Sequence, residues 1–344
     1  MSKLINNNQS NMIEEISTII EEIKLNLVKE IISSAVNSKW HIGRIITKNE
    51  VEHNNRLEYG SEVLKGLSDE LTKYLGKGYS VTNLKYMRMF YKAYPNFEDI
   101  TQGISWSHYL ELMIISDKDK RSFYEKEAIN NHWDVRELRR QLKTSLFERL
   151  LASDGKANKE KVYQMAKKGQ IINKPNDLLK EPYVLEFLNI RENKPIYEKE
   201  LEYKLIRHLE DFILELGKGF MFVGSQQRIS VNGTDYFVDM VFYNKFLKSY
   251  ILIDLKREQL KHENIGQMNL YLNYFEENFN DEGDNKPVGI ILCAEKDKVM
   301  AELALGGITN NIFAQTYTYY IPDKEVLIKE VEKIIKDNEG NDNG

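Results

Sequence analysis

The chain has 344 residues, of which 42% are hydrophobic and 29% are charged, and it contains one cysteine. This length suits two domains better than one. A single cysteine, Cys293, excludes an internal disulfide framework and a CxxC zinc site. No run approaches the roughly 20 apolar residues of a membrane span, and the first residues lack a signal-peptide pattern. We therefore expect a cytoplasmic protein without a membrane partner.

The charge is unevenly distributed along the chain. Residues 1–200 carry 32 Lys and Arg against 29 Asp and Glu, whereas residues 201–344 carry 16 against 24. An acidic second half does not suit a domain that grips phosphates by bulk positive charge. It suits a domain that gathers carboxylates around a cation.

The first half of the chain predicts helices. Turn signals such as Gly76-Lys-Gly, Tyr94-Pro-Asn and Gly103 separate segments in which apolar residues recur at helical spacing. These segments are 12–36, 61–75, 81–94, 106–115, 121–129 and 134–152. We predict a mostly α-helical N-terminal domain over 12–152, followed by a polar, Lys-rich linker over 153–180.

After about residue 196 the pattern changes to alternating helices and strands. A helix over 197–216 ends at Gly217. Strand-like runs then occupy 220–223, 227–231, 236–243 and 250–255. A helix over 263–277, a buried strand over 288–294, a short helix from about 296, a strand over 312–320 and a last helix over 323–337 follow. We predict an α/β domain over 181–337 with a mixed sheet flanked by helices.

Two predicted strands contain charges among apolar neighbours. Asp239 lies within Tyr236-Phe-Val-Asp-Met-Val-Phe-Tyr, and Asp254 and Lys256 close the run Tyr250-Ile-Leu-Ile-Asp-Leu-Lys. Strand side chains alternate between faces, so Asp254 and Lys256 point the same way. Burial of a lone carboxylate costs several kcal/mol. If the two strands are neighbours, Asp239 and Asp254 converge, and a divalent cation between them would offset that cost.

This arrangement has a chemical use in phosphodiester hydrolysis. Carboxylate oxygens are the ligands that hard ions such as Mg²⁺ prefer. A metal held there acidifies a water and polarises the phosphate, and an adjacent lysine can stabilise the developing negative charge. We expect Mg²⁺ or Mn²⁺ as the cofactor.

Asp239 together with Asp254-Leu255-Lys256 resembles the D…(D/E)xK signature of PD-(D/E)xK nucleases. That resemblance implies a restriction-endonuclease-like fold, with Lys256 acting on the water or the phosphate. It implies metal ligands at Asp239, Asp254, the Leu255 carbonyl and, from the preceding helix, Glu202. No proline precedes Asp239, and the second acid is Asp rather than Glu, which the superfamily pattern tolerates.

A second element lies downstream, in Gln267-Met-Asn-Leu-Tyr271, which resembles the QxxxY element of the RecB-like branch. Residues i and i+4 share a helix face, so Gln267 and Tyr271 can reach one site together. We include both in the predicted catalytic set, where they would position the metal shell or the backbone.

The resemblance extends over roughly residues 15–335, to the YhcG-like family of bacterial PD-(D/E)xK nucleases. In the first half it rests on Trp40-His-Ile-Gly-Arg44, Tyr59-Gly60, Gly76-Lys-Gly-Tyr-Ser80, Ser105-Trp-Ser-His-Tyr109 and Trp133-Asp-Val-Arg136. The family implies a nuclease fold but does not establish a substrate. A role in mobile-element defence or DNA processing is an association from this resemblance alone. No GxxxxGK[ST] motif is present, so any motor must come from another subunit.

Basic residues in the N-terminal half form two candidate nucleic-acid surfaces. The segment 61–94 resembles a helix-turn-helix. Three basic residues lie along one face of its second helix, and three lie along one face of a later helix; we call each set a basic stripe. The stripes are Lys85, Arg88 and Lys92, and Arg136, Arg140 and Lys143. Phosphate contact is one interpretation, and an ordinary solvated helix face is the alternative.

Each candidate also has an ordinary structural explanation. Asp239 could be a strand-end carboxylate, Asp254 and Lys256 a solvated cross-strand pair, and Glu202 part of a solvated helix face. Gln267 and Tyr271 could simply cap and pack their helix. The joint pattern favours a metal-dependent nuclease acting on nucleic acid, with DNA preferred as the substrate. The sequence leaves open whether the protein forms a homo-oligomer or binds a partner protein. The alternatives are a non-catalytic DNA-binding or assembly module with the same fold, and an RNA nuclease.

Overall fold

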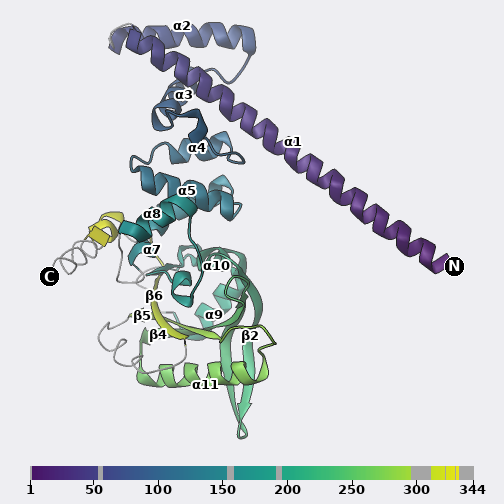
Figure 1. Cartoon of the computed structure of the whole chain (residues 1–344). Coiled ribbons are helices and arrows are strands. Elements are labelled where there is room, and N and C mark those ends of the chain that lie inside the picture. The colour runs from purple at the N-terminus through teal and green to yellow at the C-terminus, as the bar shows by residue number, and fades with distance from the viewer. Residues whose placement is uncertain are drawn as a thin grey trace. The chain divides into compact units, whose positions relative to one another are not determined.

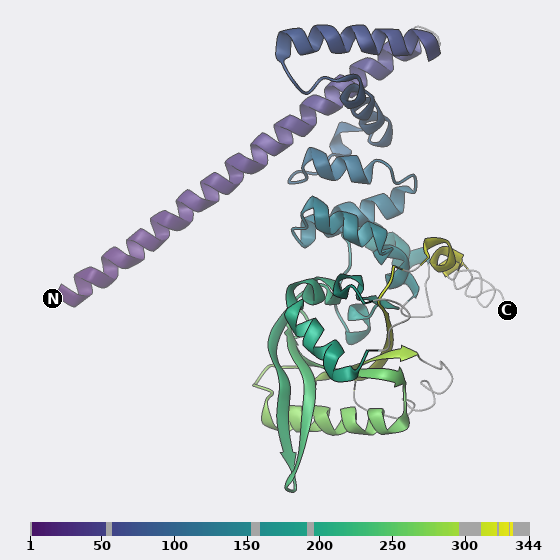
Figure 2. The same ribbon diagram turned by 180° about the vertical axis from the view of Figure 1, so that it is seen from behind.

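The computed structural model describes residues 2–52, 57–152, 159–190, 196–295, 311–321, 323–329 and 331–332 (Figures 1 and 2). The chain forms two compact units, Met1–Arg139 and Arg140–Gly344. Across these described ranges no helix has both the length and the apolar character needed to cross a membrane.

The first unit is helical, as predicted. Its described elements are α1 (Ser2–Glu52), α2 (Leu57–Leu75), α3 (Val81–Ala93), the 3-10 turn η1 (Phe97–Asp99), α4 (Trp106–Leu112), α5 (Lys118–Asn130) and α6 (Val135–Lys143), which crosses the division. The helix α1 continues well past the predicted end at residue 36, because Val36, Trp40 and Ile46 extend its apolar spacing and are buried.

A close helix contact explains part of the tryptophan motif in α1. A Cβ atom added to Gly43 would lie 2.0 Å from the carbonyl oxygen of Met87 in α3, so only glycine lets these helices approach. The indole N–H of Trp40 donates to the carbonyl of Tyr94 at 2.7 Å. Ile46, Leu64, Leu84 and Met87 form a core among α1, α2 and α3.

His108 has a comparable structural role. One ring nitrogen lies 2.7 Å from the Ser105 hydroxyl and the other 3.0 Å from the Trp133 carbonyl, which ties α4 to the turn before α6. The Ser-Trp-Ser-His string therefore supports the helical unit.

The second unit contains an α/β layered structure. Its described elements are α7 (Leu146–Ala152), α8 (Lys159–Lys168), η2 (Pro175–Leu178), β1 (Tyr183–Val184), η3 (Glu186–Leu188), α9 (Glu198–Arg207), α10 (Leu209–Leu216), β2 (Phe220–Val231), β3 (Thr234–Asn244), β4 (Ser249–Gln259), α11 (His262–Asn278), β5 (Val288–Glu295) and β6 (Asn311–Thr318). Residues 324–329 and 331–332 are also helical. The short helix predicted from residue 296, and the remainder of the last helix, lie outside the described residues.

Two predicted helices are interrupted. The segment 134–152 divides into α6 and α7 where Ser145 adopts a positive φ of 54°. The segment 197–216 divides into α9 and α10 at His208. The runs 220–223 and 227–231 form one strand, β2, with a bulge between Phe222 and Gly224.

The sheet has the order β1-β6-β5-β4-β3-β2, and it is mixed as predicted. β2, β3 and β4 are antiparallel neighbours, whereas β4, β5, β6 and β1 pair in parallel. Leu201, Leu205 and Phe212 of α9 and α10 pack on one face. Met268 and Leu272 of α11 pack on the other, so helices cover both faces (Figure 2).

A buried ion cluster places the start of this unit earlier than the predicted residue 181. The Glu215 carboxylate is fully buried and contacts the guanidinium of Arg149 at 2.5 Å and that of Arg140 at 3.1 Å. Lys180 donates to the Glu215 carbonyl. Burial alone would raise the pKa of Glu215, but these cations lower it to about 2. Three residues before 181 thus belong to the core of the second unit.

The structure describes most of the predicted linker 153–180. Residues 153–158 lie outside the described residues. The rest contains α8 and η2, and Leu178 and Leu179 are buried. We propose that an independent C-terminal domain includes 159–180 as well as α7.

We predict that a fragment 135–344 unfolds cooperatively and that a fragment 181–344 does not. The shorter fragment leaves Glu215 buried without its cations, which costs about 3–5 kcal/mol. Differential scanning calorimetry of both fragments measures this. A short fragment carrying Glu215→Leu should regain part of the lost stability. Equal melting temperatures for the two unsubstituted fragments would place the boundary at 181 after all.

Candidate active site

Asp239 and Asp254 meet where β3 and β4 separate, a point that we call the fork. Regular pairing between these strands ends at Met240 and Ile253, and the same register places Asp239 opposite Asp254. Beyond it, the Asp239 carboxylate accepts the backbone N–H of Leu255 at 2.8 Å. The side chain thus takes the place of a backbone ladder partner and holds the two strands at a fixed separation.

Asp254 is buried beside Lys256. The side chain is 3% exposed, and its Oδ2 atom lies 2.8 Å from the Lys256 ammonium. Burial, together with the neighbouring Asp239 charge, raises the pKa of Asp254 to about 7. The charge of Lys256 and its hydrogen bond to this carboxylate both act to lower the pKa of Asp254. Burial also raises the pKa of Asp239.

Lys256 stays charged in this setting. Burial favours its neutral form, but the charges of Asp254, Glu198 and Asp239 outweigh burial and raise the pKa of the ammonium. The Glu198 carboxylate lies 3.5 Å from it. The Tyr317 hydroxyl donates to the Lys256 carbonyl at 3.2 Å, which fixes the backbone at this position.

Glu198 was not among the predicted site residues, although it is one of several acids near Glu202 in the sequence. It begins α9, and its second oxygen accepts the Arg257 N–H at 3.4 Å. Glu198 and Glu202 are four residues apart and share a helix face. That spacing was the signal that could have paired them.

Glu202 reaches the site through Gln226. The Gln226 amide donates to Asp239 Oδ1 at 3.2 Å, and Glu202 also hydrogen-bonds to Gln226. Burial raises the pKa of Glu202. Gln226 has a positive φ of 49° and lies between positions paired with Met240 and Val238, opposite Asp239. This placement of Gln226 depends on the upstream bulge between Phe222 and Gly224 and on the positive φ of Gln226 itself. The alternation of residues in a strand sequence predicts neither feature.

Gln267 and Tyr271 are brought together as the i, i+4 spacing predicted. The Gln267 amide donates to the Tyr271 hydroxyl, and that hydroxyl donates to the Phe237 carbonyl at 3.1 Å. Tyr271 is fully buried. It therefore holds β3 two residues before Asp239.

The donor set at the fork fits a divalent cation. The buried Asp254 carboxylate lies beside the half-buried Asp239 carboxylate, and the Lys256 ammonium is 2.8 Å from the Asp254 Oδ2 atom. A cation or a proton would relieve the repulsion between the two carboxylates. Among the described residues, however, no three His, Cys, Asp or Glu side chains form a ready metal cluster. Water or substrate oxygens would have to complete the shell, and direct ligation by Glu202 stays a prediction.

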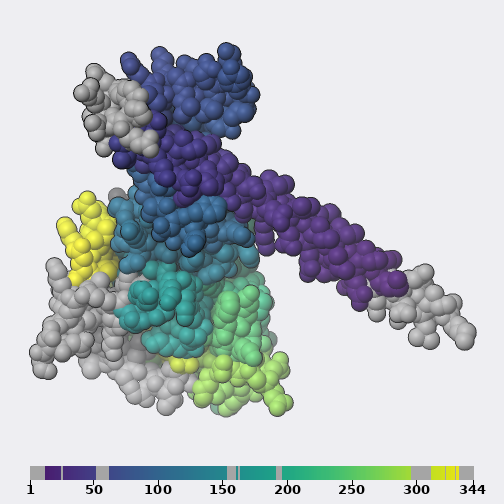
Figure 3. Space-filling view, turned by 45° about the horizontal axis from the view of Figure 1, so that its top comes forward, coloured from purple at the N-terminus to yellow at the C-terminus, as the bar shows by residue number. Residues whose placement is uncertain are grey.

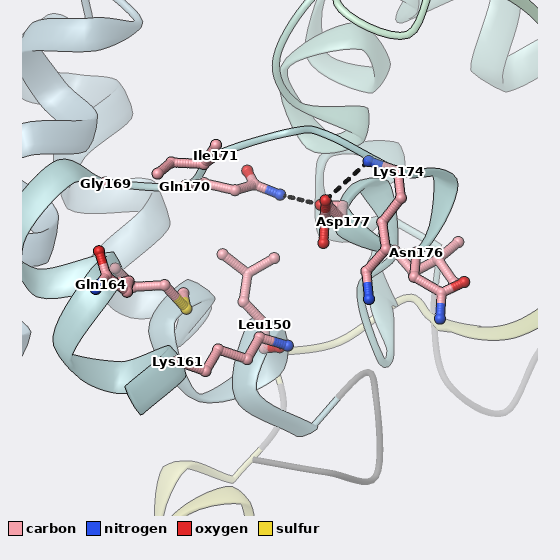
Figure 4. A pocket seen from close by; sticks show the side chains of 11 residues that line it. Leu150, Lys161, Gln164, Gly169, Gln170, Ile171, Lys174, Asn176 and Asp177 are labelled. Carbon is pink, nitrogen blue, oxygen red and sulfur yellow. Dashed lines mark hydrogen bonds between the residues drawn. The ribbon is translucent and has the colours of Figure 1, made fainter. Parts of the chain in front are cut away.

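A pocket of about 240 Å³ lies elsewhere in the second unit (Figure 4). Gln170 donates to the Asp177 carbonyl beside it, and the Asp177 carboxylate accepts the Lys174 N–H at 3.0 Å. Lys161 donates to the Leu150 carbonyl at 3.1 Å. None of the fork residues lines this pocket, so it has no part in the candidate active site.

The predicted basic stripes are not uniform. Lys85, Arg136 and Lys143 are exposed. Arg88 pairs with Glu50, and Lys92 lies 3.8 Å from the same carboxylate.

Arg140 instead contacts Glu186 and Glu215, and its side chain is 15% exposed. Two carboxylates therefore already occupy its guanidinium, which interrupts the stripe that it was predicted to share with Arg136 and Lys143.

Comparison with known proteins identifies the family. Residues 15–149 match the DUF1016 N-terminal domain, and residues 176–332 match the YhcG PDDEXK nuclease domain. The chain is 32% identical to the Escherichia coli (strain K12) protein named "Putative nuclease YhcG", over 91% of each chain. The chain belongs to the YhcG family of PDDEXK nucleases. The resemblance read from the sequence is thereby confirmed, and so is the predicted fold class.

Two solved structures align with part of this YhcG-family chain. A repair endonuclease from Pyrococcus abyssi aligns over 39% of the chain and 50% of its own, with 13% identity and a TM-score of 0.25. EndoMS in its apo form aligns over 38% and 49%, with 18% identity and a TM-score of 0.25. The chain thus spans about half the length of each.

The Asp254 environment predicts how stability depends on pH. A carboxyl whose pKa is higher in the folded than in the unfolded state stabilises folding at low pH, and this contribution is lost as pH rises through the folded value. In EDTA, wild-type stability should therefore fall between about pH 4 and pH 7 relative to Asp254→Asn. Chemical denaturation at a series of pH values measures the difference, with Asp69→Asn on exposed α2 as control. A constant offset across that range would contradict the burial argument.

Proposed function

We propose that this YhcG-family protein is a Mg²⁺- or Mn²⁺-dependent nuclease that hydrolyses phosphodiester bonds of DNA. The observation that carries the proposal is the fork, where Asp239, the buried Asp254 carboxylate and the Lys256 ammonium converge. Family membership supports a nuclease. The choice of DNA rests only on the association with DNA processing that the sequence resemblance suggests, and the assays below compare DNA with RNA.

The protein's own groups have separable roles in this proposal. Asp239 and Asp254 would hold the cation, which when bound supplies the charge that acidifies a water and polarises the phosphate. Lys256 keeps its proton beside the carboxylates and can stabilise negative charge on the phosphate in the transition state. Glu198 and Tyr317 hold Lys256, from its ammonium and its carbonyl respectively.

The supporting shell fixes the geometry of the acids. Tyr271 holds the β3 backbone through Phe237, and Gln226 holds the Asp239 carboxylate. Catalysis is sensitive to misplacement of reacting groups by about 1 Å. Gln267 and Tyr271 are thus proposed as positioning residues rather than groups that touch the substrate.

We predict that Asp239→Asn and Asp254→Asn abolish cleavage and weaken Mn²⁺ binding, while folding survives. Each change removes one charge from the pair but keeps its shape. Lys256→Ala should reduce the rate by about 100-fold or more and alter metal affinity much less, since the lysine serves the transition state. The measurements are Mn²⁺ titration by calorimetry and cleavage of plasmid, linear single-stranded DNA and RNA.

Asp69→Asn and Lys329→Ala, both on exposed positions, serve as matched controls for these changes. Cleavage that persists in EDTA, or full activity in Asp254→Asn, would refute the metal mechanism. Faster cleavage of RNA than of either DNA would make it a ribonuclease. Binding of DNA without cleavage under any metal would favour the non-catalytic module.

The second basic stripe yields a separate prediction. Arg140→Ala should lower stability by about 2 kcal/mol, since it removes hydrogen bonds to charged partners. Lys143→Ala on the same helix should leave stability unchanged. If Lys143 contacts phosphate, it should reduce the slope of log affinity against log salt by about one unit. Filter binding at several salt concentrations tests this, and an unchanged slope would assign Lys143 to solvated surface.

A further inference from the structure

The first half of α1 presents an apolar face that no described part of the chain covers. Its side chains become buried only from Val36 onward, where α1 packs against α3. Figure 3 shows this half as a rod with a free surface. Nine large apolar side chains on residues 12–31 are each between 46% and 68% exposed. They are Met12, Ile13, Ile16, Ile19, Ile20, Ile23, Leu27, Val28 and Ile31.

Five of these residues follow coiled-coil spacing. Ile13, Ile16, Ile20, Ile23 and Leu27 are separated by three, four, three and four residues. This is the alternation of a and d positions that forms a seam between paired helices. We call these five residues the isoleucine seam. Their spacing departs from the roughly 3.6-residue period of a helix that packs on a globular core.

The size of the face suits a stable partner. Nine side chains, each about half exposed, offer on the order of 800 Å², which is what one partner contributes to a standard protein interface. The largest apolar patch on a typical monomer is about 300–600 Å². The area is therefore larger than a solvated surface normally leaves open.

The charges on α1 select among partners. Residues 12–31 contain five glutamates and two lysines. Helices that lie on membranes carry Lys and Arg on the polar face, and phosphate binding needs positive charge. An acidic helix fits neither anionic surface.

A second copy of the same segment fits in charge as well as in shape. With the two helices antiparallel and centred between Ile20 and Ile23, each of these residues faces the other, and Ile16 faces Leu27. The same register brings Glu14 level with Lys29, and it also brings Ile13 level with Glu30 and Glu21 level with Glu22. A parallel pair would instead align the glutamate-rich stretch 14–22 with itself. The antiparallel pair therefore has fewer contacts between like charges than a parallel pair has.

We propose that the isoleucine seam joins two copies of this chain through an antiparallel coiled coil of their α1 helices. The inference does not depend on catalysis, since it rests only on residues of the first unit. The assembly would carry two copies of the fork.

Sedimentation velocity of the full chain over a range of concentrations tests the proposal. Wild type should sediment as a dimer. Ile20→Lys combined with Ile23→Lys should weaken dimerisation by more than about 100-fold, because four charges would enter the seam. Thr18→Lys combined with Glu22→Gln changes the net charge equally but outside the seam, and should remain dimeric. Circular dichroism melts of both variants check that they stay folded.

Cysteine cross-linking tests the orientation. The native Cys293 is buried, so chains bearing Ile16→Cys or Leu27→Cys report on the seam. When the two variants are mixed and oxidised, an antiparallel pair should give mostly disulfide-linked dimers of one Ile16→Cys chain with one Leu27→Cys chain. A parallel pair would instead link two Ile16→Cys chains to each other. A monomeric wild type, or a seam double variant that remains dimeric, would overturn the proposal. Wild type that stays monomeric but binds anionic vesicles would assign the face to a membrane instead.

Discussion

The structure of the second unit depends on one electrostatic constraint, which is that the buried Asp254 carboxylate lies beside a second, half-buried carboxylate, Asp239. Apolar cores on both faces of the sheet leave Asp254 almost no water. Its charge then costs free energy unless a proton, a cation or Lys256 compensates for it. The fork is thus a place where the fold gives up stability, as functional sites commonly do.

The surrounding contacts follow from that constraint. Glu198 approaches Lys256, so the ammonium is shared between a buried and a half-exposed acid. Asp239 is held by a backbone N–H and by Gln226, which limits its motion without neutralising it. Lys256 therefore offsets part of the repulsion between the acids, and a bound cation would offset more of it.

The site residues that could be predicted from the sequence are those marked by a local pattern within one strand or one helix. Asp254 and Lys256 stood out because period-two alternation placed charges inside an apolar strand. The Gln267–Tyr271 spacing similarly indicated a shared face. Gln226 could not be foreseen, because its direction depends on a β-bulge and a positive φ.

The compact second unit extends back to Arg140, before the predicted domain start at residue 181, for a related reason. Arg149 is one of several charged residues in the predicted helix 134–152, and its partner Glu215 lies 66 residues away. A linker predicted from local composition takes no account of a contact between residues so far apart in the sequence. The same holds for Arg140, which a helical stripe assigned to the surface and the structure turns toward two acids.

The sequence separations within the site have a consequence for folding order. The Asp239–Leu255 bond spans 16 residues and lies within one hairpin, so it can form early. The Tyr271–Phe237 bond spans 34 residues, while the contacts of Glu198 and Tyr317 with Lys256 span 58 and 61. Loop-closure entropy delays such distant contacts. A nascent chain would thus assemble the acidic pair before the groups that hold its lysine, and cation capture could begin on a partly folded intermediate.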